Sequence, residues 1–285
     1  MLRPDLHRTP NLGPGGLHKR SNRAATAHGP EPTAAAVDYP NIPTPSADPA
    51  QSDEPRLLDA REQFAVGPPR DVHFPTPQLA SDLLPDFTTT TQIAYQDIRT
   101  TCVKLVSAIE QGLGVPPNAI SGPAVGGAGA ELNLNFYPQV ERRVLDYEST
   151  MRRIWPHSDL GVVSALMQDG AGASGLELQV READEAGGAF APVDMEQEGD
   201  LVLFVGDTLE RWTNGYLRAA IHRVGLPSAS GLKTVPERRS AVMFYRAPPT
   251  ASLGPLPYFV NASNPARYEQ VTASEYLKQH NRRLY

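Results

Sequence analysis

The sequence has little of what several classes of protein need. Cys102 is its single cysteine, so an intramolecular disulfide framework is excluded. No segment approaches the roughly 18 consecutive apolar residues that span a bilayer, and the N-terminus lacks the apolar stretch of a secretory signal. Basic residues are also few: 26 Lys and Arg stand against 32 Asp and Glu, so nothing electrostatic favours nucleic acid or an anionic membrane. We therefore expect a cytoplasmic monomer with no membrane or nucleic-acid partner.

Proline divides the chain into parts. Of the 28 prolines, 14 lie within the first 77 of the 285 residues. Residues 1–52 show neither helical nor strand periodicity and bury too little apolar area to offset the entropy of ordering, so they are predicted to form a disordered Pro/Ala-rich tail. A helical N-terminal region is expected over residues 53–130 and the main folded domain over residues 131–285.

Deletion of residues 1–50 is the first test. Because this segment lacks the apolar content to pack, its removal should leave the melting temperature almost unchanged in a calorimetric scan. A fall of many degrees would show instead that the segment packs on the folded domain.

Residues 89–114 carry the longest helical pattern. Apolar residues recur along it at helical spacing, namely Ile98, Cys102, Leu105, Val106, Ile109 and Leu113. Threonines are available to cap its start, and Gly112 or Gly114 to end it. Because Cys102 lies on the apolar stripe, we interpret it as a buried small hydrophobe and not as a nucleophile.

The pattern changes to short strands after residue 131. Six apolar segments are separated by Gly, Pro, Asp and Asn, namely residues 132–138, 162–168, 175–180, 200–206, 217–224 and 239–246. Such a series indicates a sandwich or barrel. A last helix is predicted from Thr272, because TASE (272–275) has the pattern of a capping box, with Glu275 reaching back to the N-cap.

Two histidines and an aspartate form a candidate metal site. His157 and Asp159 are two apart, so on a strand their side chains would share a face. Taken alone, this pair is as well explained by an ordinary hydrogen bond, and His222 alone by a core histidine. Together the three make the facial triad of non-haem Fe(II) oxygenases, which leaves three positions free for co-substrate and dioxygen.

Arg238 and Ser240 form a candidate anion site. They also share one face if ERRS (237–240) forms part of a strand. A guanidinium that points into a barrel needs an anion, and a carboxylate that accepts two parallel hydrogen bonds suits it. The alternative is that Arg238 or its neighbour Arg239 lies on the surface.

Taken together, the chain resembles the iron- and 2-oxoglutarate-dependent dioxygenase superfamily, in the branch that contains isopenicillin N synthase and plant and fungal oxygenases. The stretches that carry the resemblance run in the family's order from about residue 56 to the end, namely REQFAVG (61–67), LNFYP (134–138), WPHSDLGVVSALMQD (155–169), GLELQV (175–180), EGDLVLFVGDTLERWTNGYLRAAIHRVGLP (198–227), PERRSAVMFY (236–245) and PARYEQVTASEYL (265–277).

The resemblance implies a mainly β fold, a double-stranded β-helix (jelly roll) with flanking helices. It implies that Fe(II) is held by His157, Asp159 and His222. The distal carboxylate of 2-oxoglutarate would be bound by Arg238 and Ser240, assisted by Tyr137, with Asn135 beside them on the same strand. No further catalytic residue is implied. Asn214 and Gly215 match a turn of structural role.

Two stretches depart from the family's pattern. The N-terminal strand of the type IPVIDL and the GFF…NHG segment that walls part of the family's active site are not found in this sequence. We therefore expect the domain to lack an edge strand and part of the substrate wall. Asn133 stands where an arginine is common in the family.

The activity implied by the resemblance is oxidation of an unactivated C–H bond of a small molecule, with dioxygen as the second substrate. Hydroxylation, desaturation and ring closure all fit, and a role in secondary metabolism is expected from the family. Two alternatives stay open. One is an oxidase like isopenicillin N synthase, which does not use 2-oxoglutarate, and the other is a truncated, non-catalytic metal-binding jelly roll.

Overall fold

A computed structural model describes residues 58–69, 76–77, 79, 84–122, 129–145, 151–169, 175–180, 189–195, 197, 199–226 and 233–284. The predicted tail over residues 1–52 lies outside the described residues. Within the described residues, no helix combines the length and the apolar character needed to cross a membrane.

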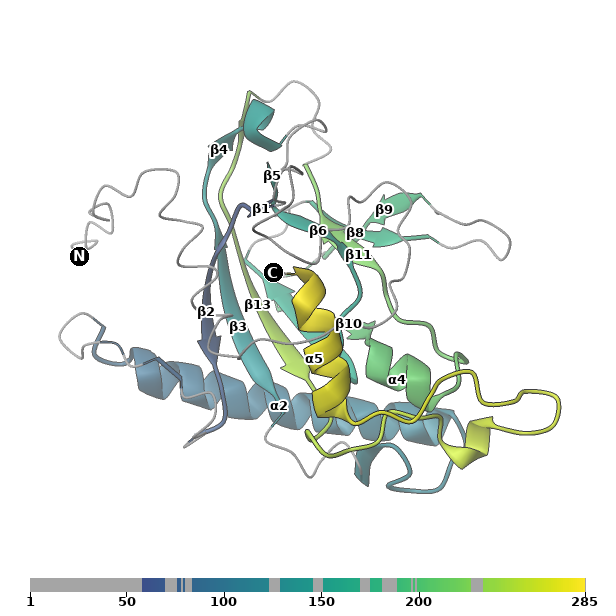
Figure 1. The fold of residues 1–285 in the computed structure, drawn as a ribbon. Coiled ribbons are helices and arrows are strands. Elements are labelled where there is room, and N and C mark those ends of the chain that lie inside the picture. The colour runs from purple at the N-terminus through teal and green to yellow at the C-terminus, as the bar shows by residue number, and fades with distance from the viewer. Residues whose placement is uncertain are drawn as a thin grey trace.

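Two antiparallel sheets form the body of the molecule (Figure 1). The five-stranded main sheet has the order β10-β7-β13-β3-β2, with β2 Glu62–Val66, β3 Glu131–Tyr137, β7 Val163–Gln168, β10 Val202–Val205 and β13 Arg238–Tyr245. The four-stranded second sheet has the order β6-β11-β8-β9, with β6 Ile154–His157, β8 Leu176–Gln179, β9 Phe190–Pro192 and β11 His222–Val224. This is the arrangement expected of a jelly roll.

Shorter elements complete the fold. Two small pairs join β1 (Leu58–Asp59) to β5 (Met151–Arg152), and β4 (Val140–Glu141) to β12 (Thr234–Val235). Among the described residues, the helices are α2 Phe87–Gly112, α4 Asp207–Trp212 and α5 Ala273–Leu284, with 3₁₀ turns at Arg142–Leu145 and Pro257–Phe259.

Alternation along β13 separates two apolar cores. Met243 and Tyr245 lie in the larger cluster, which includes buried residues of α2 such as Cys102. Val242 packs in a smaller cluster with residues of the second sheet, and Phe244 contacts the same cluster. Odd-numbered residues of β13 therefore face the helix, and even-numbered residues face the space between the two sheets.

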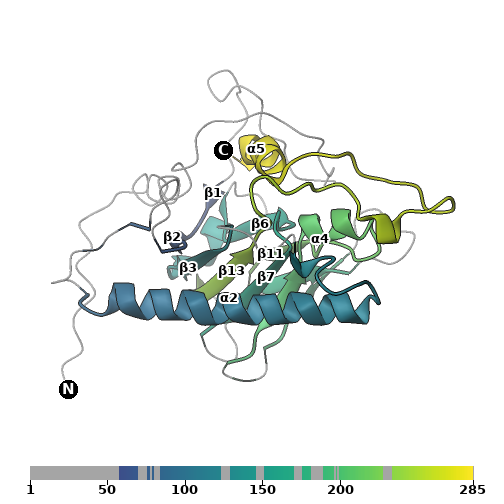
Figure 2. The same ribbon diagram turned by 90° about the horizontal axis from the view of Figure 1, so that it is seen from below.

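Helix α2 covers the outer side of the main sheet. Figure 2 shows it running along β3, β13 and β7, and it contacts β13, β7 and β2. The predicted helix and the burial of Cys102 are confirmed. The predicted threonine cap is wrong: the helix begins after Asp86 without a side-chain cap, and Thr91 instead bonds back to the carbonyl of Phe87 within the helix.

The six predicted strands correspond to β3, β7, β8, β10, β11 and β13, whereas β2, β6 and β9 of the two sheets and the short strands β1, β4, β5 and β12 were not predicted. Residues 217–221 were expected as strand but lie outside β11. Two of their amides are hydrogen-bonded to side chains in or next to α4 instead of to a strand: the Leu217 amide donates to Thr213 Oγ1, and the Ala219 amide donates to Glu210 Oε2. The region 53–130 is not helical throughout, since β2 pairs with β3 and occupies the edge of the main sheet where a strand was expected to be lacking.

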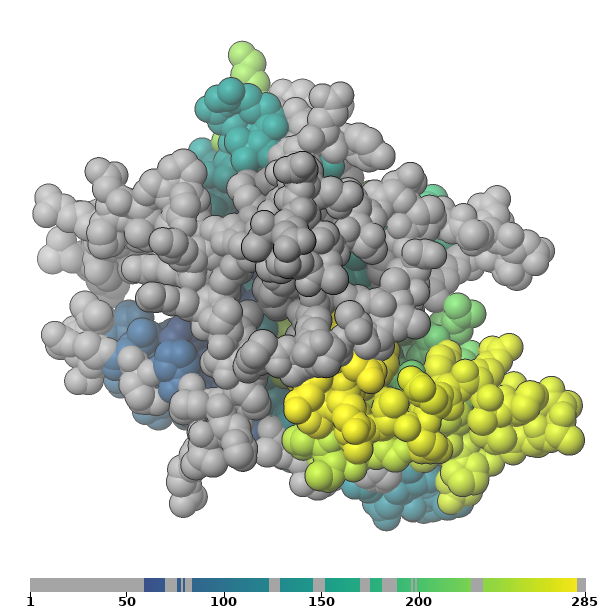
Figure 3. Space-filling model, in the orientation of Figure 1, coloured from purple at the N-terminus to yellow at the C-terminus, as the bar shows by residue number. Residues whose placement is uncertain are grey.

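The C-terminal helix begins as predicted. The Glu275 amide donates to Thr272 Oγ1, and the Thr272 amide donates to Glu275 Oε2 at 2.8 Å, which completes the capping box. Tyr276 Oη donates to Asp207 Oδ2 and so ties α5 to α4. The C-terminal segment, yellow in Figure 3, forms a continuous part of the surface on this side of the molecule.

Candidate functional site

Three side chains from two strands and a loop converge at one end of the second sheet. His157 ends β6 and lies directly opposite His222 of β11 in the antiparallel pairing. His157 Nε2 is 3.5 Å from Asp159 Oδ1, and His222 Nε2 is 3.9 Å from Asp159 Oδ2. Ligand atoms of all three lie within 4.8 Å of one another, which is close enough for one metal ion to bind all three.

Asp159 reaches this position by a different route from the one predicted. It lies beyond the end of β6, so strand alternation does not place it beside His157. The turn is held instead by the start of α4, where the Asp207 amide donates to the Asp159 carbonyl at 2.7 Å. Gly206 allows this approach, because a Cβ there would overlap the carbonyl of Gly161.

Both imidazoles are fixed in the form that a metal requires. His157 Nδ1 lies 2.8 Å from the carbonyl of Trp155, and His222 Nδ1 lies 2.9 Å from the carbonyl of Ala220. A carbonyl can only accept, so each Nδ1 donates and each Nε2 keeps its lone pair free. Phe204 stacks on His222 at 4.4 Å between ring centroids and restricts the imidazole further.

The electrostatics of the three groups also suit a divalent cation. Burial alone would raise the pKa of Asp159, but His222 and His157 hold it well below the usual value of an aspartate. Burial, together with His157, lowers the pKa of His222, so this imidazole is neutral near pH 7. Asp159 Oδ2 is buried without a hydrogen-bond partner. A buried carboxylate oxygen in that state is suited to a positive ion.

The second predicted site lies between the sheets at the start of β13. Arg238 is 2% and Ser240 7% exposed, and Arg238 Nη1 donates to Ser240 Oγ at 3.1 Å. Arg238 Nη2 donates to Gln168 Oε1 of β7 at 2.9 Å. In the register of β13 with β3, Tyr137 is opposite Arg238 and Asn135 opposite Ser240. All four predicted residues therefore come together on one inner face.

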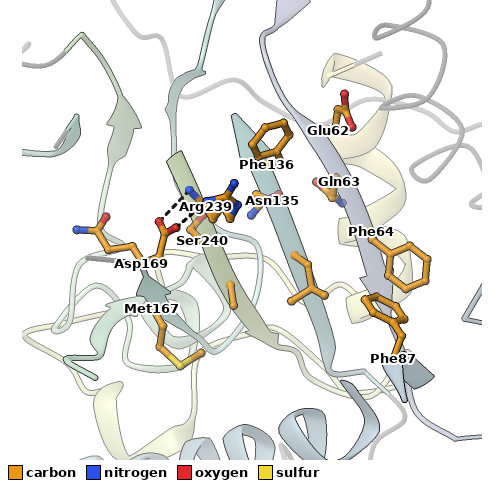
Figure 4. Close-up of a pocket in the computed structure, with 13 residues that line it drawn as sticks. Glu62, Gln63, Phe64, Phe87, Asn135, Phe136, Met167, Asp169, Arg239 and Ser240 are labelled. Carbon is orange, nitrogen blue, oxygen red and sulfur yellow. Dashed lines mark hydrogen bonds and ion pairs between the residues drawn. The ribbon is translucent and has the colours of Figure 1, made fainter. Parts of the chain in front are cut away.

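Arg239 points to the opposite side of the main sheet. It pairs with Asp169 at 3.3 Å and borders a groove of about 780 Å³ on the outer face. Figure 4 shows this groove with Phe64, Phe87 and Phe136 among its lining residues. None of the three candidate metal ligands lines the groove, although Asn135, Gln168 and Ser240 of the neighbouring Arg238 site are among its lining residues.

Asn214 and Gly215 have the structural role expected of them. Both have positive φ, 53° and 82°, in the turn that follows α4. The Asn214 side chain accepts from the Arg267 amide and donates to the carbonyl of Pro265. The turn therefore anchors the segment that leads to α5.

Comparison with known proteins places these residues in a family. The model of the 2OG-Fe(II) oxygenase superfamily matches residues 130–247, a range that includes all seven predicted site residues. The proline hydroxylase buaE of Petromyces alliaceus is 33% identical over 221 residues, which cover 77% of this chain and 67% of that protein. The chain belongs to the 2OG-Fe(II) oxygenase superfamily.

Other members support the same assignment. The 2-oxoglutarate-dependent dioxygenase imqE of Aspergillus flavus is 34% identical over 232 residues, 80% of this chain. The full-length T7H of Neurospora crassa, solved in complex with alpha-KG, superposes with a TM-score of 0.68 at 25% identity over 78% of this chain and 65% of that chain. The chain described here spans 62% of the length of imqE. The predicted jelly roll is confirmed by these matches, whereas the isopenicillin N synthase-like branch stays a prediction.

Sequence reasoning missed two contacts of the candidate site, Gln168 on Arg238 and Phe204 on His222. The sequence gives a weak indication that Gln168 faces inward. It lies two residues from Leu166 and four from Ser164 on the predicted strand, so all three should share one face. Phe204 has no local signal, because its stacking depends on how β10 approaches β11.

Proposed function

We propose that this protein is an Fe(II)- and 2-oxoglutarate-dependent dioxygenase that oxidises an unactivated C–H bond of a small molecule. The observation that carries the proposal is the pairing of two sites in one fold. Ligand atoms of His157, Asp159 and His222 lie within 4.8 Å of one another. A buried Arg238–Ser240 pair faces the same space between the sheets.

In this proposal His157, Asp159 and His222 hold the iron. When bound, Fe(II) and 2-oxoglutarate together reduce dioxygen and supply the oxidising power, and the co-substrate leaves as succinate and CO₂. An ion held by these three residues would still have room to bind the co-substrate and dioxygen. His157 is 31% exposed, against 5% for Asp159 and 8% for His222, so the His157 side is the accessible one.

Arg238 and Ser240 position the co-substrate. The planar guanidinium and the hydroxyl offer donors to one carboxylate, and Tyr137 and Asn135 line the same inner face. Burial protects this contact from competing water, so the hydrogen bonds are stronger than on the surface. The name of the 2OG-Fe(II) oxygenase superfamily and the alpha-KG bound in the T7H complex support this part of the proposal.

The substrate class is proposed more broadly. Relatives named as fungal dioxygenases, and one named as a proline hydroxylase, support a small molecule of secondary metabolism. Hydroxylation, desaturation and ring closure all fit the site. The monomeric state and cytoplasmic location are proposals on sequence grounds, and size-exclusion chromatography and microscopy of the tagged protein would test them.

Coupled turnover tests the proposed function. Purified, Fe(II)-loaded protein should convert 2-oxoglutarate to succinate in the presence of oxygen, slowly alone and faster with a substrate found by a mass-spectrometric screen. Substrate oxidation without succinate would favour the oxidase that uses no 2-oxoglutarate. Absence of both reactions in protein that binds iron would favour the non-catalytic jelly roll.

A further inference from the structure

Arg153 is a buried arginine that no part of the proposed mechanism uses. It lies between β5 and β6, four residues before His157, and is 2% exposed. Its Nη2 donates to the carbonyl of Pro236, two residues before Arg238. The Arg153 side chain therefore leaves the second sheet and reaches the start of β13, where the candidate carboxylate site lies.

The guanidinium groups of Arg153 and Arg238 both lie over the ring of Tyr137. Their guanidinium carbons lie 5.7 and 5.0 Å from the centroid of the Tyr137 ring. The Nε atoms of both arginines are buried without hydrogen-bond partners. Burial and the neighbouring Arg238 lower the pKa of Arg153 to about 10, so Arg153 stays charged at neutral pH. Burial also lowers the pKa of Arg238, but a guanidinium keeps its proton in proteins. Two cations thus stand close together in the interior.

The described residues supply no anion to balance them. Within the described ranges, the ion pairs include no carboxylate partner for either arginine. Asp169 acts on Arg238 only from a distance, since its carboxylate pairs with Arg239 on the outer face. Contact with one tyrosine face offsets less than the cost of burying a cation without a partner. The pair is therefore suited to an anionic ligand.

We propose that Arg153 is a second arginine of the pocket for the distal carboxylate of a dicarboxylic 2-oxo acid. The inference rests on the proposed function, because it assumes that Arg238 binds that carboxylate. Arg153 then positions the same group from the opposite sheet. Arg153 and Arg238 together then make the protein bind a 2-oxo acid that has a second carboxylate more tightly than one that lacks it.

The test compares two ligands that differ only in this carboxylate. Binding of 2-oxoglutarate and of 2-oxopentanoate, which has the same carbon chain with a methyl end, is measured by anaerobic calorimetry on the Mn(II)-loaded protein. Arg153→Met should weaken 2-oxoglutarate by about 10-fold or more and leave 2-oxopentanoate unchanged. The matched control is Arg152→Met, since Arg152 stacks on Trp155 and bonds to the Leu145 carbonyl. This variant should change neither affinity.

Stability provides a second readout. Without ligand, Arg153→Met should melt at or above the temperature of the wild type, because it removes a buried cation that lacks an anion. If it does not fold, Arg153→Lys keeps the charge, loses the planar fork and should still reduce the preference for 2-oxoglutarate. Equal weakening of both ligands, or an unchanged preference in the variant that folds, would overturn the role of Arg153. A wild type that does not prefer 2-oxoglutarate at all would overturn the proposed function itself.

Discussion

Replacing His222 by alanine should abolish Fe(II) binding and turnover. The change leaves two protein ligands and removes the imidazole that lies 3.9 Å from Asp159 Oδ2. Loss of a residue that only orients a ligand typically weakens metal binding by about 10- to 100-fold. Loss of a ligand should therefore cost at least that factor. Fe(II) binding is measured anaerobically by competition with a chromogenic chelator, and turnover by succinate release.

Companion variants make this result decisive. His157→Ala should lose iron to a similar extent, and its partly exposed position makes a folding defect less severe. Asp159→Asn keeps the shape and removes the charge, and should also fail to bind iron. Asp97→Ala, on the exposed side of α2, changes a carboxylate away from the site and should bind iron normally. If the His222 variant kept full turnover, the metal site would have to be sought elsewhere.

The predicted site residues lie close together in the structure, but not always for the predicted reason. Strand alternation correctly placed Arg238 and Ser240 on one inward face, because β13 is a regular strand with regular neighbours on both sides. The same rule grouped His157 with Asp159 for the wrong reason. The aspartate follows the strand, and a turn held by α4 brings it back.

Contacts between distant segments mark the limit of prediction. Residues 217–221 have the composition of a strand, yet the amides of Leu217 and Ala219 donate to side chains in or next to α4. Arg153 binds a carbonyl 83 residues away in the sequence, so no local pattern signals its direction. Periodicity shows which face of an element is buried. The partner of a buried polar group depends on how the two sheets approach each other.

Replacing Arg238 by lysine should weaken the apparent affinity for 2-oxoglutarate by roughly 10- to 100-fold. Lysine keeps the charge but loses the planar fork, so two parallel hydrogen bonds become one flexible contact. Hydrogen bonds to charged partners contribute about 1.5–3 kcal/mol, and each 1.4 kcal/mol corresponds to about tenfold. Iron binding should stay near normal, because no metal ligand changes. Succinate release at varied 2-oxoglutarate, together with the chelator assay, measures both quantities.

Arg239→Lys is the matched control for this prediction. Arg239 is the next residue of β13, and its side chain is 56% exposed and paired with Asp169 and Glu237 on the outer face. Surface ion pairs of this kind contribute at most about 1 kcal/mol to stability, and this one lies on the face of the main sheet opposite the buried Arg238 side chain. The variant should therefore bind 2-oxoglutarate as the wild type does. If the two variants behaved alike, or if only Arg239 mattered, the inward register of β13 would not define the co-substrate site, and the carboxylate would have to bind on the outer face.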